Sequence, residues 1–118
     1  VVEWRAPQPF DLITCSHGLH YLGDKLRVLE KVAGWLSPQG LFVAHLDLTN
    51  IRVEASDSGA LLRQLLRRAG FAYSARTRLL RRVGSAPVQF GLRYLGADDG
   101  AGPNYSGQPA VTSYYALT

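Results

Sequence analysis

Residues 9–48, PFDLITCSHGLHYLGDKLRVLEKVAGWLSPQGLFVAHLDL, constrain the fold more than any other part of the chain. The apolar run FDLITC, within residues 9–16, is typical of a strand that is buried on both faces. A helical pattern follows it, and a second apolar run covers residues 41–48. Because two strands joined by one helical crossover pair in parallel, this stretch predicts an α/β fold.

Two helices are predicted from apolar residues spaced by three and four. The first begins at Asp24, whose carboxylate can cap a helix N-terminus, and ends at SPQG. The second covers residues 58–69 and is followed by Gly70, which tolerates a positive φ. Three residues could cap this second helix: Ser56, Asp57 and Ser58.

The chain after the second helix predicts a pair of antiparallel strands. Residues 71–83 alternate, GSAP is a turn, and residues 88–94 place apolar side chains on one face. We expect these two strands to form a hairpin. The tail, residues 96–118, contains Gly, Pro and Tyr and is predicted to be irregular. The whole order is β-α-β-α-β-β in a single domain, residues 1–118.

Composition places the chain among small soluble domains. It has 118 residues, of which 47% are hydrophobic and 19% charged. No apolar run reaches the ~18 residues that a membrane span needs, and VVEWRAPQ lacks the pattern of a signal peptide. The single cysteine cannot form an internal disulfide. We therefore expect a cytoplasmic protein that has no membrane partner.

The positive charge is unevenly distributed. The net charge is +4, and seven of the 13 basic residues lie between Arg63 and Arg82. Such a cluster can bind phosphates, but no aromatic stacking pattern accompanies it. A solvated helix face and an exposed strand are the favoured interpretation. A basic nucleic-acid-binding module stays open as the less favoured alternative.

The motifs, in this order and spacing, resemble the C-terminal half of the class I S-adenosylmethionine-dependent methyltransferases. The strand motif is FDLI at residues 10–13, and the loop after it carries GLH at residues 18–20. The helix ends in LSPQG at residues 36–40, and LLRRAGF at residues 65–71 precedes the next strand. The resemblance covers about residues 1 to 95. It implies a partial Rossmann-like sheet of parallel strands, closed by a C-terminal antiparallel hairpin.

The first half of that family's pattern is absent from this sequence. No strand ends in a G-x-G loop followed by a helix, and no second strand ends in an acid for ribose hydroxyls. The one G-x-G, residues 100–102, has no strand or helix pattern around it. By the family's layout the chain starts near the end of the third strand, so its N-terminal half is missing. An unpaired strand edge and an uncovered apolar sheet face are therefore expected.

The resemblance also implies a site. In open α/β sheets ligands bind beyond the carboxyl ends of the strands, where Cys15, Ser16 and His17 lie. These three residues are the expected contacts to S-adenosylmethionine. His17, His20 and Tyr21 would then face the transferring methyl group or the methyl acceptor.

The candidate base is a histidine, because imidazole can accept a proton near pH 7. His17 is the first candidate and His20 the second, and each has a structural alternative as a capping or packing residue. Asp47 and Asn50, near the end of the second strand, could touch the acceptor or could serve as caps. His45, in mid-strand, is expected to be structural.

Other chemistries find little support in the sequence. Nothing near Cys15 would activate its thiol, and no C-x-x-C or H-x-x-x-H spacing suggests zinc. The CSHG sequence is not a G-x-S-x-G nucleophile elbow. We therefore expect a methyltransferase of a small molecule, inactive without its other half. The alternative is a non-catalytic subunit that pairs with that half or with itself.

Overall fold

The structure is a computed structural model that describes residues 8–16, 18–54, 57–98 and 110–117. These residues form two α-helices, seven strands and two 3-10 helices. In chain order the elements are β1 (Phe10–Cys15), η1 (Gly18–Tyr21), α1 (Lys25–Trp35), β2 (Leu36–His45), η2 (Leu48–Asn50), β3 (Ile51–Val53), α2 (Ser58–Arg68), β4 (Ala72–Ser74), β5 (Leu79–Val83), β6 (Leu92–Asp98) and β7 (Thr112–Leu117).

The larger sheet has four strands in the order β1-β2-β5-β4. Strands β1 and β2 are parallel, with Leu12 opposite Leu41 and Cys15 opposite Ala44. Strand β5 runs antiparallel to both of its neighbours, β2 and β4. The predicted α/β class, with parallel strands around one crossover helix, is thereby confirmed.

The predicted hairpin partner is wrong. Residues 71–83 are themselves a hairpin, in which β4 and β5 flank a turn at residues 75–78. Arg78 has a φ of 57° in this turn. A positive φ is usually found at glycine, so the sequence does not indicate this turn. The chain after Gly84 runs on without pairing to β5. Val88 and Phe90, expected on a strand, are instead buried in the connection before β6.

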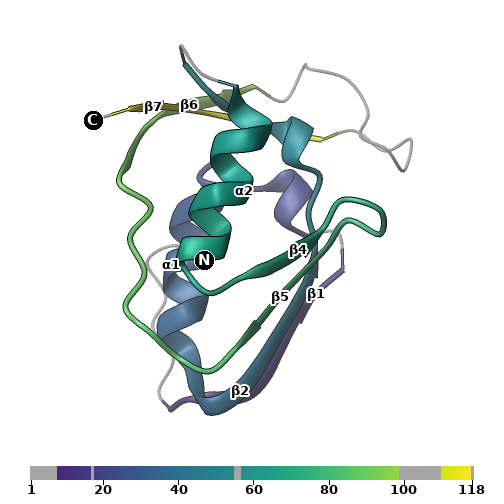
Figure 1. Cartoon of the computed structure of the whole chain (residues 1–118), viewed down its shortest axis with the longest axis vertical. Coiled ribbons are helices and arrows are strands. Elements are labelled where there is room, and N and C mark those ends of the chain that lie inside the picture. The colour runs from purple at the N-terminus through teal and green to yellow at the C-terminus, as the bar shows by residue number, and fades with distance from the viewer. Residues whose placement is uncertain (1–7, 17, 55–56, 99–109, 118) are drawn as a thin grey trace.

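The smaller sheet corrects the prediction of an irregular tail. Its order is β3-β7-β6, so the last strand of the chain is its centre. Strand β7 pairs in parallel with β3 and antiparallel with β6. Figure 1 shows this sheet beyond the end of the larger sheet at which β1 and β2 finish. The run TSYYAL is rich in residues that favour strands, but its partners lie far away in the sequence.

Both helices cover the same face of the larger sheet (Figure 1). On that face Phe42, Ala44 and Leu80 are buried, and they belong to the core that also contains apolar residues of both helices. The Phe71 ring meets the Phe42 ring edge-on at a centroid distance of 6.4 Å. The Arg82 guanidinium carbon lies 5.2 Å from the centre of the Phe71 ring, so this buried arginine belongs to the same face.

The helix ends follow their sequence signals. Asp24 caps α1 by accepting a hydrogen bond from the Arg27 amide at 3.2 Å. Asp57 caps α2 by accepting one from the Ala60 amide at 3.3 Å. Gly70, after α2, has a φ of +87°. Neither helix in the described part of the chain has the length and apolar character needed to cross a membrane.

Strand β7 is joined to the start of α1 through Tyr115. Its hydroxyl donates to Asp24 Oδ1 at 2.8 Å and accepts from the Leu26 amide at 3.0 Å. The Tyr115 side chain is almost completely buried, and burial raises the pKa of its phenol well above the ordinary value. The C-terminal strand is thus held by directed polar contacts as well as by packing.

Replacing Tyr115 with Phe should lower the free energy of unfolding by about 1 to 3 kcal/mol, because Asp24 and the Leu26 amide lose a buried partner. Urea unfolding followed by circular dichroism measures the change. Tyr94→Phe is the matched control, since Tyr94 lies opposite Tyr115 on β6 but is 40% exposed. Equal losses in the two variants would contradict the assignment.

Candidate functional site

The carboxyl ends of β1 and β2 lie side by side. Because Cys15 is opposite Ala44 in a parallel pair, Ser16 leaves the sheet at the same end as the segment that leads to Asp47. The topology therefore groups two of the residues expected to contact the cofactor, Cys15 and Ser16, with Asp47 and Asn50. This is the end of an α/β sheet at which ligands usually bind.

Cys15 and Ser16 differ in accessibility. Cys15 is half-buried and packs against the core. A Cβ atom added to Gly18 would lie 2.8 Å from its sulfur, so only glycine fits at that position without a shift. Ser16 is exposed, and its hydroxyl can therefore meet a ligand. His17, the first candidate base, lies outside the described residues.

His20 and Tyr21 belong to η1, and they too differ in accessibility. The His20 side chain is 0% exposed, whereas Tyr21 is 48% exposed. The His20 carbonyl accepts a hydrogen bond from the Val111 amide at 2.7 Å, which ties η1 to the chain just before β7. In this arrangement a molecule in solution can reach Tyr21 but not the His20 ring.

Asp47 and Asn50 are both buried. Asp47 Oδ1 accepts hydrogen bonds from the Thr49 amide at 3.0 Å and the Thr49 hydroxyl at 2.7 Å, and so caps η2. Asn50 is 7% exposed, and its Oδ1 is buried without a hydrogen-bond partner among the described residues. Asp47 thus has a structural task in the loop, and the Asn50 oxygen is closed to solvent.

Lys25 is the residue whose position sequence reasoning missed. The charge of a lysine favours an exposed position on a helix, yet Lys25 is 0% exposed. Its Nζ donates to the Leu22 carbonyl at 2.8 Å, the Val111 carbonyl at 2.5 Å and Ser113 Oγ at 2.9 Å. Burial lowers the pKa of Lys25 to about 8. The sequence does indicate this buried position through spacing. Lys25 comes three residues after Leu22 and four before Leu29, on the edge of the apolar stripe.

The Lys25–Ser113 contact has the chemistry of an activated serine but not its accessibility. A lysine with a lowered pKa beside a hydroxyl can serve as a base in catalysis. Ser113, however, is 0% exposed and donates its own proton to the Gly23 carbonyl. No substrate can reach either group in this arrangement. The pair therefore fixes β7 against the start of α1.

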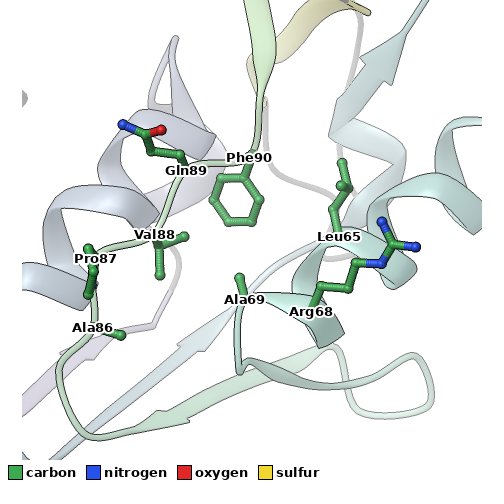
Figure 2. Close-up of a pocket in the computed structure, with 8 residues that line it drawn as sticks. All are labelled: Leu65, Arg68, Ala69, Ala86, Pro87, Val88, Gln89 and Phe90. Atoms are coloured by element: carbon green, nitrogen blue, oxygen red, sulfur yellow. The ribbon is translucent and has the colours of Figure 1, made fainter.

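The large hollows lie at the other end of the sheet. One of about 450 Å³ is lined by Leu65, Arg68, Ala69, Ala86, Pro87, Val88, Gln89 and Phe90 (Figure 2). A second, of about 500 Å³, lies between the same 86–89 segment and α1. The Ala86 amide donates to the Ala33 carbonyl near the C-terminal end of α1. Both hollows therefore lie away from the carboxyl ends of β1 and β2. In Figure 2 the polar ends of Arg68 and Gln89 point away from the first hollow.

No protein-family model, curated protein or solved structure matches this chain. Within the described ranges, no three His, Cys, Asp or Glu side chains lie close enough together to hold a metal ion.

The buried ammonium predicts an unusual pH dependence. In the unfolded chain Lys25 keeps its proton up to about pH 10.4, whereas the folded protein releases it near pH 8. Between these values the unfolded state binds more protons, so stability should rise with pH. Unfolding free energies from urea titrations should increase by about 1 to 2 kcal/mol between pH 7.5 and 9.5.

Lys25→Met is the comparison variant, and its profile should lack this rise whatever its absolute stability. Above about pH 10 the trend should reverse, because the unfolded chain ionises its tyrosines while buried Tyr115 stays neutral. A rise of the same size in Lys25→Met would refute the assignment to Lys25.

Proposed function

We propose that this chain is the C-terminal part of an S-adenosylmethionine-dependent methyltransferase that acts on a small-molecule acceptor in the cytoplasm. The main support is the coincidence of the sequence motifs with the sheet order. A parallel β1-α1-β2 unit is followed by α2 and closed by the antiparallel β4–β5 hairpin, with β5 beside β2. A closing hairpin of this kind is what the resemblance implies, although it uses different residues from those predicted.

One residue at this end of the sheet is available to contact the cofactor in this proposal. The Ser16 hydroxyl is exposed at the carboxyl end of β1, where the resemblance expects a cofactor contact. No Gly-rich turn between a strand and a helix is found in the sequence, and Asp47, a carboxylate at this end of the sheet, is engaged with Thr49. In this proposal the remaining contacts come from the N-terminal half that the resemblance implies. We expect the chain alone to bind the cofactor poorly and to be inactive.

The chain's own task in the reaction is positioning. When bound, S-adenosylmethionine supplies a methyl group on a sulfonium, which is already a good leaving group. The protein must hold the acceptor in line and exclude water. In this proposal Ser16 orients the cofactor, Tyr21 contacts the acceptor, and His17 removes the acceptor's proton. His20 and Asn50 are both buried at this end of the sheet, and Asp47 fixes the loop by capping η2.

In the non-catalytic alternative, the partner is again the N-terminal half that the resemblance implies. In that case the chain would pair with a cofactor-binding half and supply only structure.

The basic nucleic-acid module loses support, because Arg81 and Arg82 lie on opposite faces of the larger sheet. Arg82 is buried, with its guanidinium donating to the Ala69 and Gly84 carbonyls. The seven basic residues therefore do not form one surface.

Calorimetry with S-adenosylmethionine tests the proposal. The coding sequence upstream of Val1 should encode a strand–G-x-G–helix segment, and the extended product should bind the cofactor in the micromolar range. Ser16→Ala in that product should weaken binding by about three- to tenfold, the loss of one hydrogen bond. Ser85→Ala, at an exposed serine in the turn after β5, is the matched control and should bind normally.

The absence of such a segment together with no cofactor binding would refute the enzymatic proposal. Binding by the extended product without methyl transfer to any acceptor would favour the non-catalytic subunit.

A further inference from the structure

The larger sheet has one face that no element of the described chain covers. The pairing register places alternate residues of three strands on it. They are Leu12 and Thr14 of β1, Leu41, Val43 and His45 of β2, and Leu79, Arg81 and Val83 of β5. We call these eight residues the open face. Their strand neighbours Phe42, Ala44, Leu80 and Arg82 point the other way and are buried under the helices.

The open face is apolar and accessible. Leu12 is 60% exposed and Val83 is 68% exposed, although these side chains are as apolar as those of the core. Leu41, Val43 and Leu79 are half-buried. A sheet face that is left to solvent normally carries polar side chains, and contiguous exposed apolar patches mark interaction sites.

One charge lies in the middle of this face. Arg81 is opposite Val43, which in turn is opposite Thr14, so the arginine belongs to the central row of the patch. The Arg81 side chain is exposed and makes no ion pair or hydrogen bond with the described residues. None of the eight residues is acidic. A partner surface complementary to the open face would therefore be apolar and carry a carboxylate opposite Arg81.

We propose that an amphipathic helix of a partner polypeptide covers the open face, with an Asp or Glu in its apolar stripe that pairs with Arg81. A helix is the element that already covers the opposite face of these same strands, and helix-on-sheet packing needs such a stripe. A second copy of this chain fits less well. Packing two open faces together would bring two Arg81 side chains into one interface with no acidic residue on either face. The inference does not depend on the methyltransferase proposal.

A displayed library of amphipathic helices of about 20 residues tests the inference, with one position in the centre of the apolar stripe fully varied. Selection on the wild-type chain should enrich Asp and Glu at that position. Selection on Arg81→Glu should enrich Lys and Arg instead. Synthetic winners should bind their matched chain at least about tenfold more tightly than the swapped one, the effect of one interfacial ion pair.

Arg68→Glu is the matched control, because Arg68 is an exposed arginine on α2 and lies on the helix-covered side. It should select the same helices as the wild type, whereas Val83→Asp should bind the acidic winners at least about tenfold more weakly. The inference is overturned if no helix is enriched, or if wild type and Arg81→Glu select the same residue. It is also overturned if sedimentation shows a wild-type dimer that Val83→Asp dissociates, since the occupant would then be a second copy.

Discussion

The rest of this structure depends on the burial of one ammonium group. Lys25 lies in the first turn of α1, where the helix dipole disfavours a positive charge, and it has no exposed surface. Such a charge is tolerated only if its hydrogen bonds are satisfied. Two of its three acceptors, the Val111 carbonyl and the Ser113 hydroxyl, come from the C-terminal segment. Strand β7 is therefore necessary for the start of α1 to be stable in this position.

The same contacts determine what surrounds the strand ends. With Val111 and Ser113 held by Lys25, and Tyr115 by Asp24, β7 connects the η1 loop after β1 with β3 after β2. The small sheet thus stands beyond the carboxyl ends of the parallel strands. That position buries His20 and Asn50 and leaves Ser16 and Tyr21 accessible. Accessibility at the candidate site is consequently set by the last strand of the chain rather than by the loops themselves.

Features that depend on neighbours in sequence could be predicted, and features that depend on distant partners could not. Asp24, Asp57 and Gly70 mark helix ends through contacts within a few residues, and the apolar spacing defined both helices. The hairpin was misplaced because its turn places Arg78 at a positive φ without glycine, while the GSAP turn leads to unpaired chain. Strand β7 was missed because its contacts reach back about 60 to 90 residues, to β3 and α1.

The adjacent residues Arg81 and Arg82 show why charge counts along a sequence say little about surfaces. Because successive strand residues point to opposite faces, the Arg82 guanidinium is buried against Phe71, whereas Arg81 lies beside half-buried Val43 and exposed Val83. The buried arginine has backbone carbonyls as partners from its own chain. The exposed one has none among the described residues, although its apolar neighbours Val43 and Val83 belong to a surface of core-like composition. In the proposed assembly a partner helix supplies what the described residues do not: a carboxylate for Arg81 and an apolar cover for this face of the sheet.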